Sequence, residues 1–403
     1  MMPRCFSGWA TEPDTVDSSM EIYLVGGAIR DALLGLPVQD RDWVVVGATP
    51  EDMVGRGFVP IGRDFPVFLH PQTHEEYALA RTERKSAPGY RGFVIHAAPD
   101  VTLEQDLIRR DLTINAIAHS LEPPETEAGF SLNKERFKLD PAQLIDPFGG
   151  QRDLKAKQLR HVSEAFREDP VRILRVARFA ARFPDFSLAP ETLQLMQQMV
   201  ASGEVDHLVP ERVWQEISSG LMTIAPVRML LVLDECAALA RVAPGLDTSD
   251  RVMAALTHSV TQRATLAVRF ACLVHALPTT AALVALCAHL RVPTDCKDLA
   301  EMVWRERRAL QGLKGETPAQ QMALLERCDA IRKPQRFAEM LLACECIDAA
   351  AESASIQRLW RLDGLRRVQS VDTAAIAQAA QSSGLSGPQI GDLIRQARVA
   401  ALG

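Results

Sequence analysis

The sequence predicts an α+β protein in which a mixed α/β head is followed by an all-α region. Two observations carry this prediction. From Glu21 to about Gly150, short apolar stretches alternate with helical ones, as strands and helices do in a mixed domain. Beyond about Leu154, amphipathic patterns rich in Ala and Leu continue nearly to the end of the chain. The length of 403 residues is enough for more than one domain with its own core.

Four strands are predicted in the head. Each is a short apolar run next to turn residues, and the four are residues 22–25, 43–46, 67–69 and 76–81. Residues 121–143 contain a pair of prolines and clustered acids, which predicts a surface insertion. Residues 1–20 show no period and are predicted to be a disordered extension, or an artefact of start-codon choice.

The helical region is punctuated by prolines. Pro170 lies early in one predicted helix, where a missing N–H does no harm, and Pro210 opens another. We predict four parts for the chain, and their bounds are 1–20 for the extension, 21–150 for the head, 151–225 for a helical neck, and 226–403 for a helical body and tail.

Composition narrows the class of protein. Hydrophobic residues make up 47% and charged residues 24%, which is ordinary for a soluble globular protein. No uncharged apolar run approaches the roughly 20 residues of a membrane span, and no secretory signal is visible. The eight cysteines are scattered, so core thiols in a reducing compartment are expected rather than a disulfide framework. These features predict a cytoplasmic protein and leave its oligomeric state open.

A basic stretch stands out against a net charge of −6. The stretch is either a solvated helix face or a binding surface for an anionic partner. The second is possible despite the negative net charge, because local patches rather than net charge attract nucleic acid. Spacings of three and four residues between arginines favour the second interpretation. The basic residues of this stretch are Arg152, Lys155, Lys157, Arg160, Arg167, Arg172, Arg175, Arg178 and Arg182.

The most informative motif is a glycine turn followed by two carboxylates. Gly26 and Gly27 end the first predicted strand, and glycines let backbone N–H groups approach a phosphate closely. Arg30 follows within the next predicted helix and can face the same anion. Asp40 and Asp42 open the second predicted strand, where residues two apart share a face. Two neighbouring carboxylates repel each other unless a cation lies between them, and oxygen ligands suit Mg²⁺.

Each half of this motif is weak by itself. A lone Gly-Gly is usually a plain turn, and a lone Asp-x-Asp is usually a solvated strand end. Their occurrence together, in this order, predicts metal-assisted phosphoryl or nucleotidyl transfer. The third glycine of a dinucleotide-binding fingerprint is missing, and no Gly-Lys-Ser/Thr follows as in a P-loop.

Two further segments of the head carry candidate residues. Arg109 and Arg110 open a predicted helix, where they oppose the helix dipole and need an anionic partner such as a triphosphate. Asn115 would lie inside that helix. Glu76 is a weaker candidate for a third carboxylate, since a solvated strand glutamate is the commoner case.

Taken together, the motifs resemble those of the bacterial class II tRNA nucleotidyltransferases, the CCA-adding enzymes. The resemblance is strong from about Tyr23 to Trp214 and thins beyond. The matching runs are residues 26–31, 40–42, 81–85, 109–116 and 168–175. The resemblance implies a polymerase-β-like nucleotidyltransferase head, template-independent addition of CCA to the 3′ end of tRNA from CTP and ATP, release of pyrophosphate, and Mg²⁺ as cofactor.

The resemblance also assigns the nucleotide site. It implies Asp40 and Asp42 as catalytic metal ligands, with Gly26, Gly27, Arg30 and Arg110 around the triphosphate. It places Asp169 and Arg172 against the base, with Arg175 near the same pocket. An aspartate accepts from the amino group of cytosine or adenine, and an arginine donates to ring nitrogens or a carbonyl. An intrahelical ion pair at i and i+3 would explain the same spacing. In the family, the loop corresponding to residues 86–92 helps the switch from C to A addition.

Two alternatives remain at this point. A poly(A) polymerase of the same superfamily typically has a basic element after the metal strands, but the matching stretch 62–68 has Asp64 and Pro66 at positions where basic residues would be. A non-catalytic RNA-binding relic is the other, and the retained carboxylate pair argues against it. Many relatives also carry an HD phosphohydrolase domain in the C-terminal half. Here His275 is followed by Ala276 rather than Asp, which predicts a degenerate form of that domain.

Overall fold

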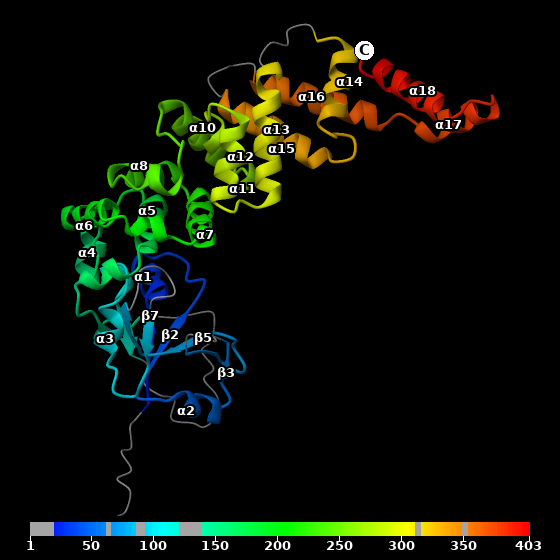
Figure 1. Ribbon diagram of the computed structural model, residues 1–403. Coiled ribbons are helices and arrows are strands. Elements are labelled where there is room, and N and C mark those ends of the chain that lie inside the picture. Colours follow the sequence, from blue (N-terminus) through cyan, green and yellow to red (C-terminus); the bar gives the residue numbers. More distant parts are fainter. Residues whose placement is uncertain (1–19, 62–65, 86–92, 121–138, 311–315, 349–353) are drawn as a thin grey trace, which may run out of the picture. The chain divides into compact units, whose positions relative to one another are not determined.

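The computed structural model describes residues 20–61, 66–85, 93–120, 139–310, 316–348 and 354–403. The chain divides into two compact units (Figure 1). The described residues up to Ala156, together with Arg160–Glu168, form the first unit, and Lys157–Leu159 and Asp169–Gly403 form the second. The predicted α/β head and helical remainder are confirmed. The expectations for residues 1–19, 62–65, 86–92 and 121–138 lie outside the described residues.

A mixed sheet forms the centre of the first unit. Its order is β3-β4-β5-β2-β1-β8-β9, with β2 antiparallel to β1 and parallel to β5. The strands are β1 (Glu21–Val25), β2 (Asp42–Val46), β3 (Val59–Pro60), β4 (Val67–Leu69), β5 (Glu76–Leu79), β8 (Ala118–Ser120) and β9 (Leu144–Ile145). All four predicted strands are present, but the predicted strand 76–81 ends at Leu79. A separate antiparallel pair consists of β6 (Thr82–Lys85) and β7 (Phe93–His96).

Apolar side chains of the central strands make the core of this unit. Tyr23, Val25 and Val44 belong to one buried cluster. Trp43 and Tyr77, at paired positions on β2 and β5, stack with ring centroids 5.4 Å apart. Such cross-strand pairs hold the register of a sheet, because a slip of one residue would expose them. The helices of this unit are α1 (Gly27–Leu33), α2 (Pro50–Gly55), α3 (Leu103–Leu107) and α4 (Gly150–Ala156).

The prediction of a helix opening at Arg109 is wrong. Helix α3 ends at Leu107 instead, and the following chain makes only a 3₁₀ turn at Thr113–Asn115 before β8. Arg109 and Arg110 follow α3 and share an anionic partner within the protein, because Asp106, three and four residues earlier, pairs with both. Asn115 therefore lies in the 3₁₀ turn and not inside a helix.

The second unit is almost entirely helical. Its first helices are α5 (Val171–Arg182), α6 (Pro190–Ala201), α7 (Pro210–Leu221), α8 (Pro226–Glu235) and α9 (Leu239–Val242). They are followed by α10 (Asp250–Thr261), α11 (Leu266–Val274), α12 (Thr280–His289), α13 (Thr294–Leu310) and α14 (Pro318–Arg327). The last are α15 (Pro334–Ile347), α16 (Ala354–Gln369), α17 (Thr373–Ser382) and α18 (Gly387–Ala400). A short parallel pair joins β10 (Gln158–Leu159) to β11 (Ser187–Leu188).

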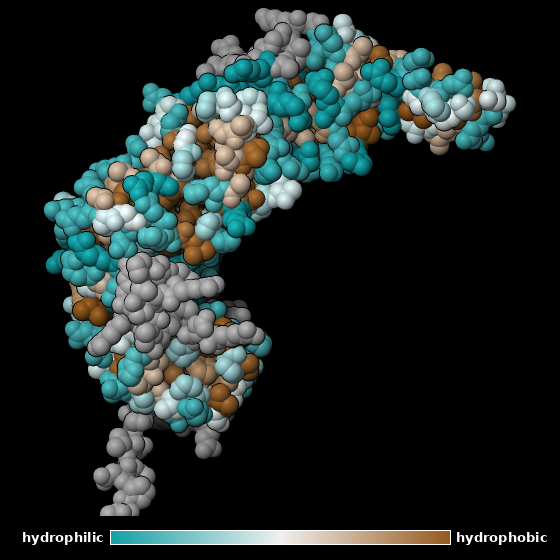
Figure 2. Space-filling view, in the orientation of Figure 1, coloured by the Kyte–Doolittle hydropathy of each residue, from teal (hydrophilic) through white to brown (hydrophobic). Residues whose placement is uncertain are grey.

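Local sequence explains where these helices begin. Proline occupies the first position of α6, α7, α8, α14 and α15, where its fixed φ suits the first turn. Apolar and polar residues are interspersed on the face of this unit seen in Figure 2. In the part of the chain that the structure describes, seven cysteines from Cys236 to Cys346 are buried and free, in line with the predicted core thiols. Within the described ranges, no helix is long and apolar enough to cross a membrane.

Candidate active site

The glycine turn has a conformation that only glycine adopts easily. Gly26 directly follows β1 with φ at +73°, in the left-handed region. Its N–H donates to the carbonyl of Ile117 at 3.1 Å, which ties the turn to the segment before β8. A Cβ at this position would lie 3.0 Å from Nη1 of Arg110. The positive φ therefore disfavours any other residue here, and the turn brings an arginine against the bare backbone.

Sheet register brings carboxylates to the same place. Asp42, the first residue of β2, is paired on one side with Val25, the residue just before the glycine turn. On its other side it is paired with Glu76, the first residue of β5. Directly paired residues of neighbouring strands point to the same face. The turn, Asp42 and Glu76 thus share one edge of the sheet.

Asp40 differs from its prediction. It lies two residues before β2, outside the strand, so strand geometry does not place both aspartates on one face. Asp40, Asp42 and Glu76 are all exposed. Among the described residues, no three His, Cys, Asp or Glu side chains are grouped closely enough to hold a metal ion. Exposed carboxylates at one edge nevertheless fit Mg²⁺, which is usually bound by one or two carboxylates together with substrate phosphates.

Arg30 is placed differently from what the motif suggested. Its side chain is buried, with the residue only 3% exposed. Its Nε donates to Asp31 at 2.9 Å and its Nη1 to Oδ1 of Asn115 at 2.6 Å. Asn115 in turn donates to Asp111 at 2.9 Å. Arg30 thereby anchors α1 to the 3₁₀ turn, and its contact with a triphosphate stays a prediction.

Arg110 is the cation that lies against the glycine turn. Its Nη2 donates to Asp106 at 3.2 Å, and its Nε is buried with no partner among the described residues. Asp106 is 1% exposed and also accepts from Arg109 at 2.7 Å. Burial would raise the pKa of Asp106, but the two guanidinium groups outweigh it and hold that pKa below its usual value. The ionised Asp106 positions Arg110 beside the turn.

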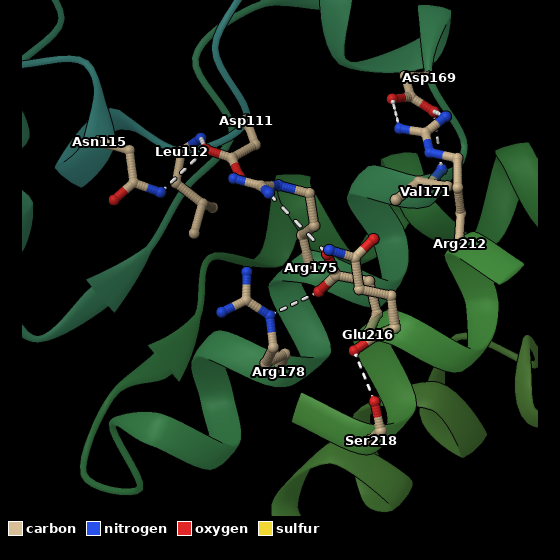
Figure 3. A network of polar contacts seen from close by, with 11 residues as sticks. Asp111, Leu112, Asn115, Asp169, Val171, Arg175, Arg178, Arg212, Glu216 and Ser218 are labelled. Atoms are coloured by element: carbon tan, nitrogen blue, oxygen red, sulfur yellow. Dashed lines mark hydrogen bonds and ion pairs between the residues drawn. The ribbon is translucent and has the colours of Figure 1, made fainter. Parts of the chain in front are cut away.

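A second set of candidate residues lies at the start of α5. Asp169 precedes this helix, and its Oδ1 accepts from the N–H of Val171 at 3.1 Å (Figure 3). The same carboxylate binds Arg212 of α7, with Nη2 to Oδ2 at 2.7 Å and Nη1 to Oδ1 at 3.3 Å. This two-point contact fixes the plane of the carboxylate. Arg172 lies on the first turn of α5 and is 7% exposed.

Two arginines of the basic stretch, Arg175 and Arg178, also contact α7. Nε of Arg178 donates to Oε2 of Glu216 at 2.5 Å, and Arg175 lies 3.9 Å from the other carboxylate oxygen (Figure 3). The Arg178 guanidinium also covers the ring of Phe179, 4.8 Å from its centroid. These arginines are therefore not a freely solvated face.

Arg212 and Glu216 were not predicted as site residues. They lie four residues apart on α7, so both face α5 from one side of the helix. Their opposite charges at a spacing of four residues could have marked them as a polar face of the helix. That spacing does not indicate which neighbouring helix the face contacts.

The structure separates the predicted site residues into two sets, each within one unit. The first unit contains Gly26, Gly27, Arg30, Asp40, Asp42 and Arg110. The second unit contains Asp169, Arg172 and Arg175.

Comparisons with known proteins decide the family. The poly A polymerase head domain matches residues 22–160, and the family described as probable RNA and SrmB-binding site of polymerase A matches residues 185–249. A multifunctional CCA protein of Paracidovorax citrulli is 54% identical over 418 residues, which cover 94% of this chain and 96% of the relative. The chain belongs to the multifunctional CCA proteins.

Solved structures agree with this CCA protein in fold. A CCA-adding enzyme of Bacillus stearothermophilus in complex with CTP has a TM-score of 0.66 at 22% identity and covers 95% of this chain and 89% of its own. A CCA-adding enzyme in complex with ATP has a TM-score of 0.67 at 21% identity and covers 95% and 86%. The CCA-protein fold is therefore shared across nearly the whole chain.

Proposed function

We propose that this chain completes the 3′ end of tRNA by adding CCA from CTP and ATP, with Asp40 and Asp42 as ligands of Mg²⁺. Membership of the multifunctional CCA proteins supports the activity. The observation that carries the assignment of residues is the strand register, which pairs Asp42 with the residue before the glycine turn. A phosphate at the turn would then lie beside the carboxylate edge. The unpaired core thiols suit a reducing compartment, and we place the reaction in the cytoplasm.

In this reaction the 3′ hydroxyl of the RNA attacks the α-phosphorus of the bound nucleotide, and pyrophosphate leaves. The chain binds the triphosphate through the bare backbone at Gly26 and Gly27 and through Arg110, which has donors to spare beside Asp106. Arg30 ties α1, which follows the glycine turn, to the 3₁₀ turn at Thr113–Asn115. When bound, Mg²⁺ supplies Lewis acidity that activates the hydroxyl and neutralises charge on the phosphate oxygens.

Choice of nucleotide is assigned to Asp169 and Arg172. The Asp169 carboxylate is oriented by Arg212 and Val171, and a carboxylate oxygen has lone pairs for a further donor. It can therefore accept from the amino group of cytosine or adenine, which uracil lacks. Arg172 supplies the donors that complete the pattern. Because the reading group is a side chain, no nucleic-acid template is needed.

The direct test incubates the full chain with tRNA that lacks CCA and with each labelled nucleotide in turn. We expect addition of C, C and A with Mg²⁺, and no addition by Asp40→Asn or Asp42→Asn. Asp100→Asn, which changes an exposed carboxylate of the same unit, is the matched control and should keep full activity. Long runs of A would identify a poly(A) polymerase. No incorporation at all would identify an RNA-binding relic.

Base reading needs its own experiment. Asp169→Asn keeps the shape of the side chain but adds a donor, so G or U should be incorporated at least about tenfold more often relative to C and A. Arg182→Gln, at the far end of α5, is the control. Unchanged selectivity in Asp169→Asn would show that the bases are read elsewhere.

A further inference from the structure

A small pocket lies within the second unit, where His275 directly follows α11. Its volume is about 130 Å³, which is room for a small polyatomic ion. Helices α10 and α13 supply the other walls. The lining residues are Arg251, His275, Ala276, Leu277, Pro278, Val303, Trp304, Arg307 and Arg308. This is the region in which the sequence predicted a degenerate HD domain.

The charge of the pocket is strongly positive. Arg251 comes from α10, and Arg307 and Arg308 come from the last turn of α13. Within the described part of the chain, none of these three arginines has an ion pair with a carboxylate. Nη1 of Arg307 is buried without a hydrogen-bond partner. Burial and the neighbouring charge of Arg251 both lower the pKa of Arg307, and the attraction of Asp348 offsets only part of this.

His275 presents a second unsatisfied atom. The residue is 6% exposed, and its Nδ1 lies 2.7 Å from the carbonyl oxygen of Cys272. A carbonyl only accepts, so Nδ1 carries the proton and Nε2 holds the free lone pair. Nε2 is buried and has no partner. Burial, Arg307 and Arg251 lower the pKa of His275, while the Cys272 carbonyl and Asp348 oppose them, and the ring is neutral near pH 7.

A cation does not suit this pocket. The lining offers a single imidazole and no carboxylate, whereas metal sites combine several such ligands. Solvent and Asp348 relieve part of the repulsion among the three guanidinium groups, and a negative charge bound between them would relieve more of it. Buried donors without partners are costly, and a bound anion with several oxygens would satisfy them.

We propose that this pocket binds a phosphate group. The guanidinium groups of Arg251, Arg307 and Arg308 donate to its oxygens, and Nε2 of His275 accepts from its hydroxyl. Free phosphate and an RNA backbone present the same oxygens to the arginines, but only free hydrogen phosphate also carries the hydroxyl from which Nε2 of His275 accepts, so a backbone phosphodiester would bind through the arginines alone. The site needs no metal and shares no residue with those assigned to nucleotide addition, so this proposal does not depend on the function proposed above.

Trp304 provides the readout. It lines the pocket, and its Nε1 donates to the carbonyl of Leu277 at 3.1 Å. The full chain is titrated with inorganic phosphate at constant ionic strength, and the fluorescence difference between the wild type and Trp304→Phe isolates this site from phosphate bound elsewhere. We expect a saturable change. Arg307→Gln should weaken binding by about tenfold or more, because a charge-assisted donor is lost.

Matched variants keep the test sharp. Arg305→Gln removes the same charge from the same helix, but Arg305 is exposed and paired with Glu306 at 2.8 Å, so phosphate binding should be unchanged. If Arg307→Gln does not fold, Arg251→Gln and Arg308→Gln replace it, because both side chains are exposed. Equal weakening in Arg305→Gln would mean that only diffuse charge is measured, which would overturn the proposal.

The source of the phosphate is separated with tRNA. If RNA occupies the pocket, tRNA displaces inorganic phosphate, and Arg307→Gln lowers both tRNA affinity and its dependence on salt, by about one phosphate contact. If the occupant is free phosphate, Arg307→Gln loses phosphate binding and keeps tRNA affinity. No saturable Trp304 signal, together with unchanged tRNA affinity in the variant lacking all three arginines, would overturn the proposal.

Discussion

Replacing Gly150 with alanine should destabilise the first unit. Gly150 begins α4 and is buried against the 3₁₀ turn. A Cβ there would lie 2.3 Å from the carbonyl oxygen of Thr113 and 2.7 Å from Cγ1 of Ile117. Such contacts below 3.0 Å are not tolerated, so α4 and the turn would have to separate by about 0.7 Å. The obstacle is partly backbone, which cannot rotate away as a side chain can.

The expected cost follows from two opposing effects. Overpacking a buried position costs about 1–3 kcal/mol. Alanine also lowers the conformational entropy of the unfolded chain, which stabilises the folded state by about 0.4–1 kcal/mol. At the midpoints of both ranges the net loss is about 1.3 kcal/mol, which for a unit of this size lowers the melting temperature by roughly 3–5 °C. Because the turn also carries Asn115, the partner of Arg30, nucleotide incorporation should fall as well.

Calorimetry and amide hydrogen exchange of the 3₁₀ turn and α4 would measure the change. Gly55→Ala is the matched control, because Gly55 ends α2, has ordinary φ and nothing within 4 Å of a Cβ. It should be neutral or slightly stabilising. A melting temperature for Gly150→Ala that equals or exceeds the wild type would show that α4 and the turn are not packed as described.

Three further outcomes are expected. The pKa of Asp106 is depressed in the folded protein, so this carboxylate stabilises the fold above its unfolded pKa near 3.8, and the stabilisation is lost as pH falls through the folded pKa. Asp106→Asn should therefore lower the free energy of unfolding at pH 7, and urea unfolding of the variant should depend less on pH under acidic conditions. Arg212→Gln should loosen Asp169 and raise KM for CTP and ATP by about tenfold with a smaller effect on kcat, and equal effects would refute a positioning role. Hydrolysis of 2′,3′-cyclic phosphates with Ni²⁺ should be absent, and turnover that disappears in His275→Ala would contradict this.

The sequence was most informative where the pattern is local. Apolar runs predicted β2 and β4 within one residue, because a short apolar run flanked by polar or turn residues is itself a strand signal. The glycine turn was predicted for the same reason, since a positive φ at Gly26 is a property of that residue alone. The strand register, which pairs Asp42 with Val25 on one side and with Glu76 on the other, could not be predicted from any local pattern.

Errors arose where the partner of a charge had to be guessed. The two arginines at 109 and 110 were expected to need a triphosphate as anionic partner, without weighing Asp106 one turn earlier. Arg212 was missed because its partner Asp169 is 43 residues away. Ion pairs between helices depend on which faces meet, and one sequence gives no information on that.

The central place of β2 in the sheet has a kinetic consequence. Both of its edges are hydrogen-bonded, so the amides of this strand can exchange only when the neighbouring strands separate. Asp42 is the first residue of this strand, whereas Asp40 precedes the strand in irregular chain. The sheet therefore holds the backbone that carries one carboxylate, and not the backbone that carries the other. Addition of metal and nucleotide should slow exchange in the segment around Asp40 far more than in β2.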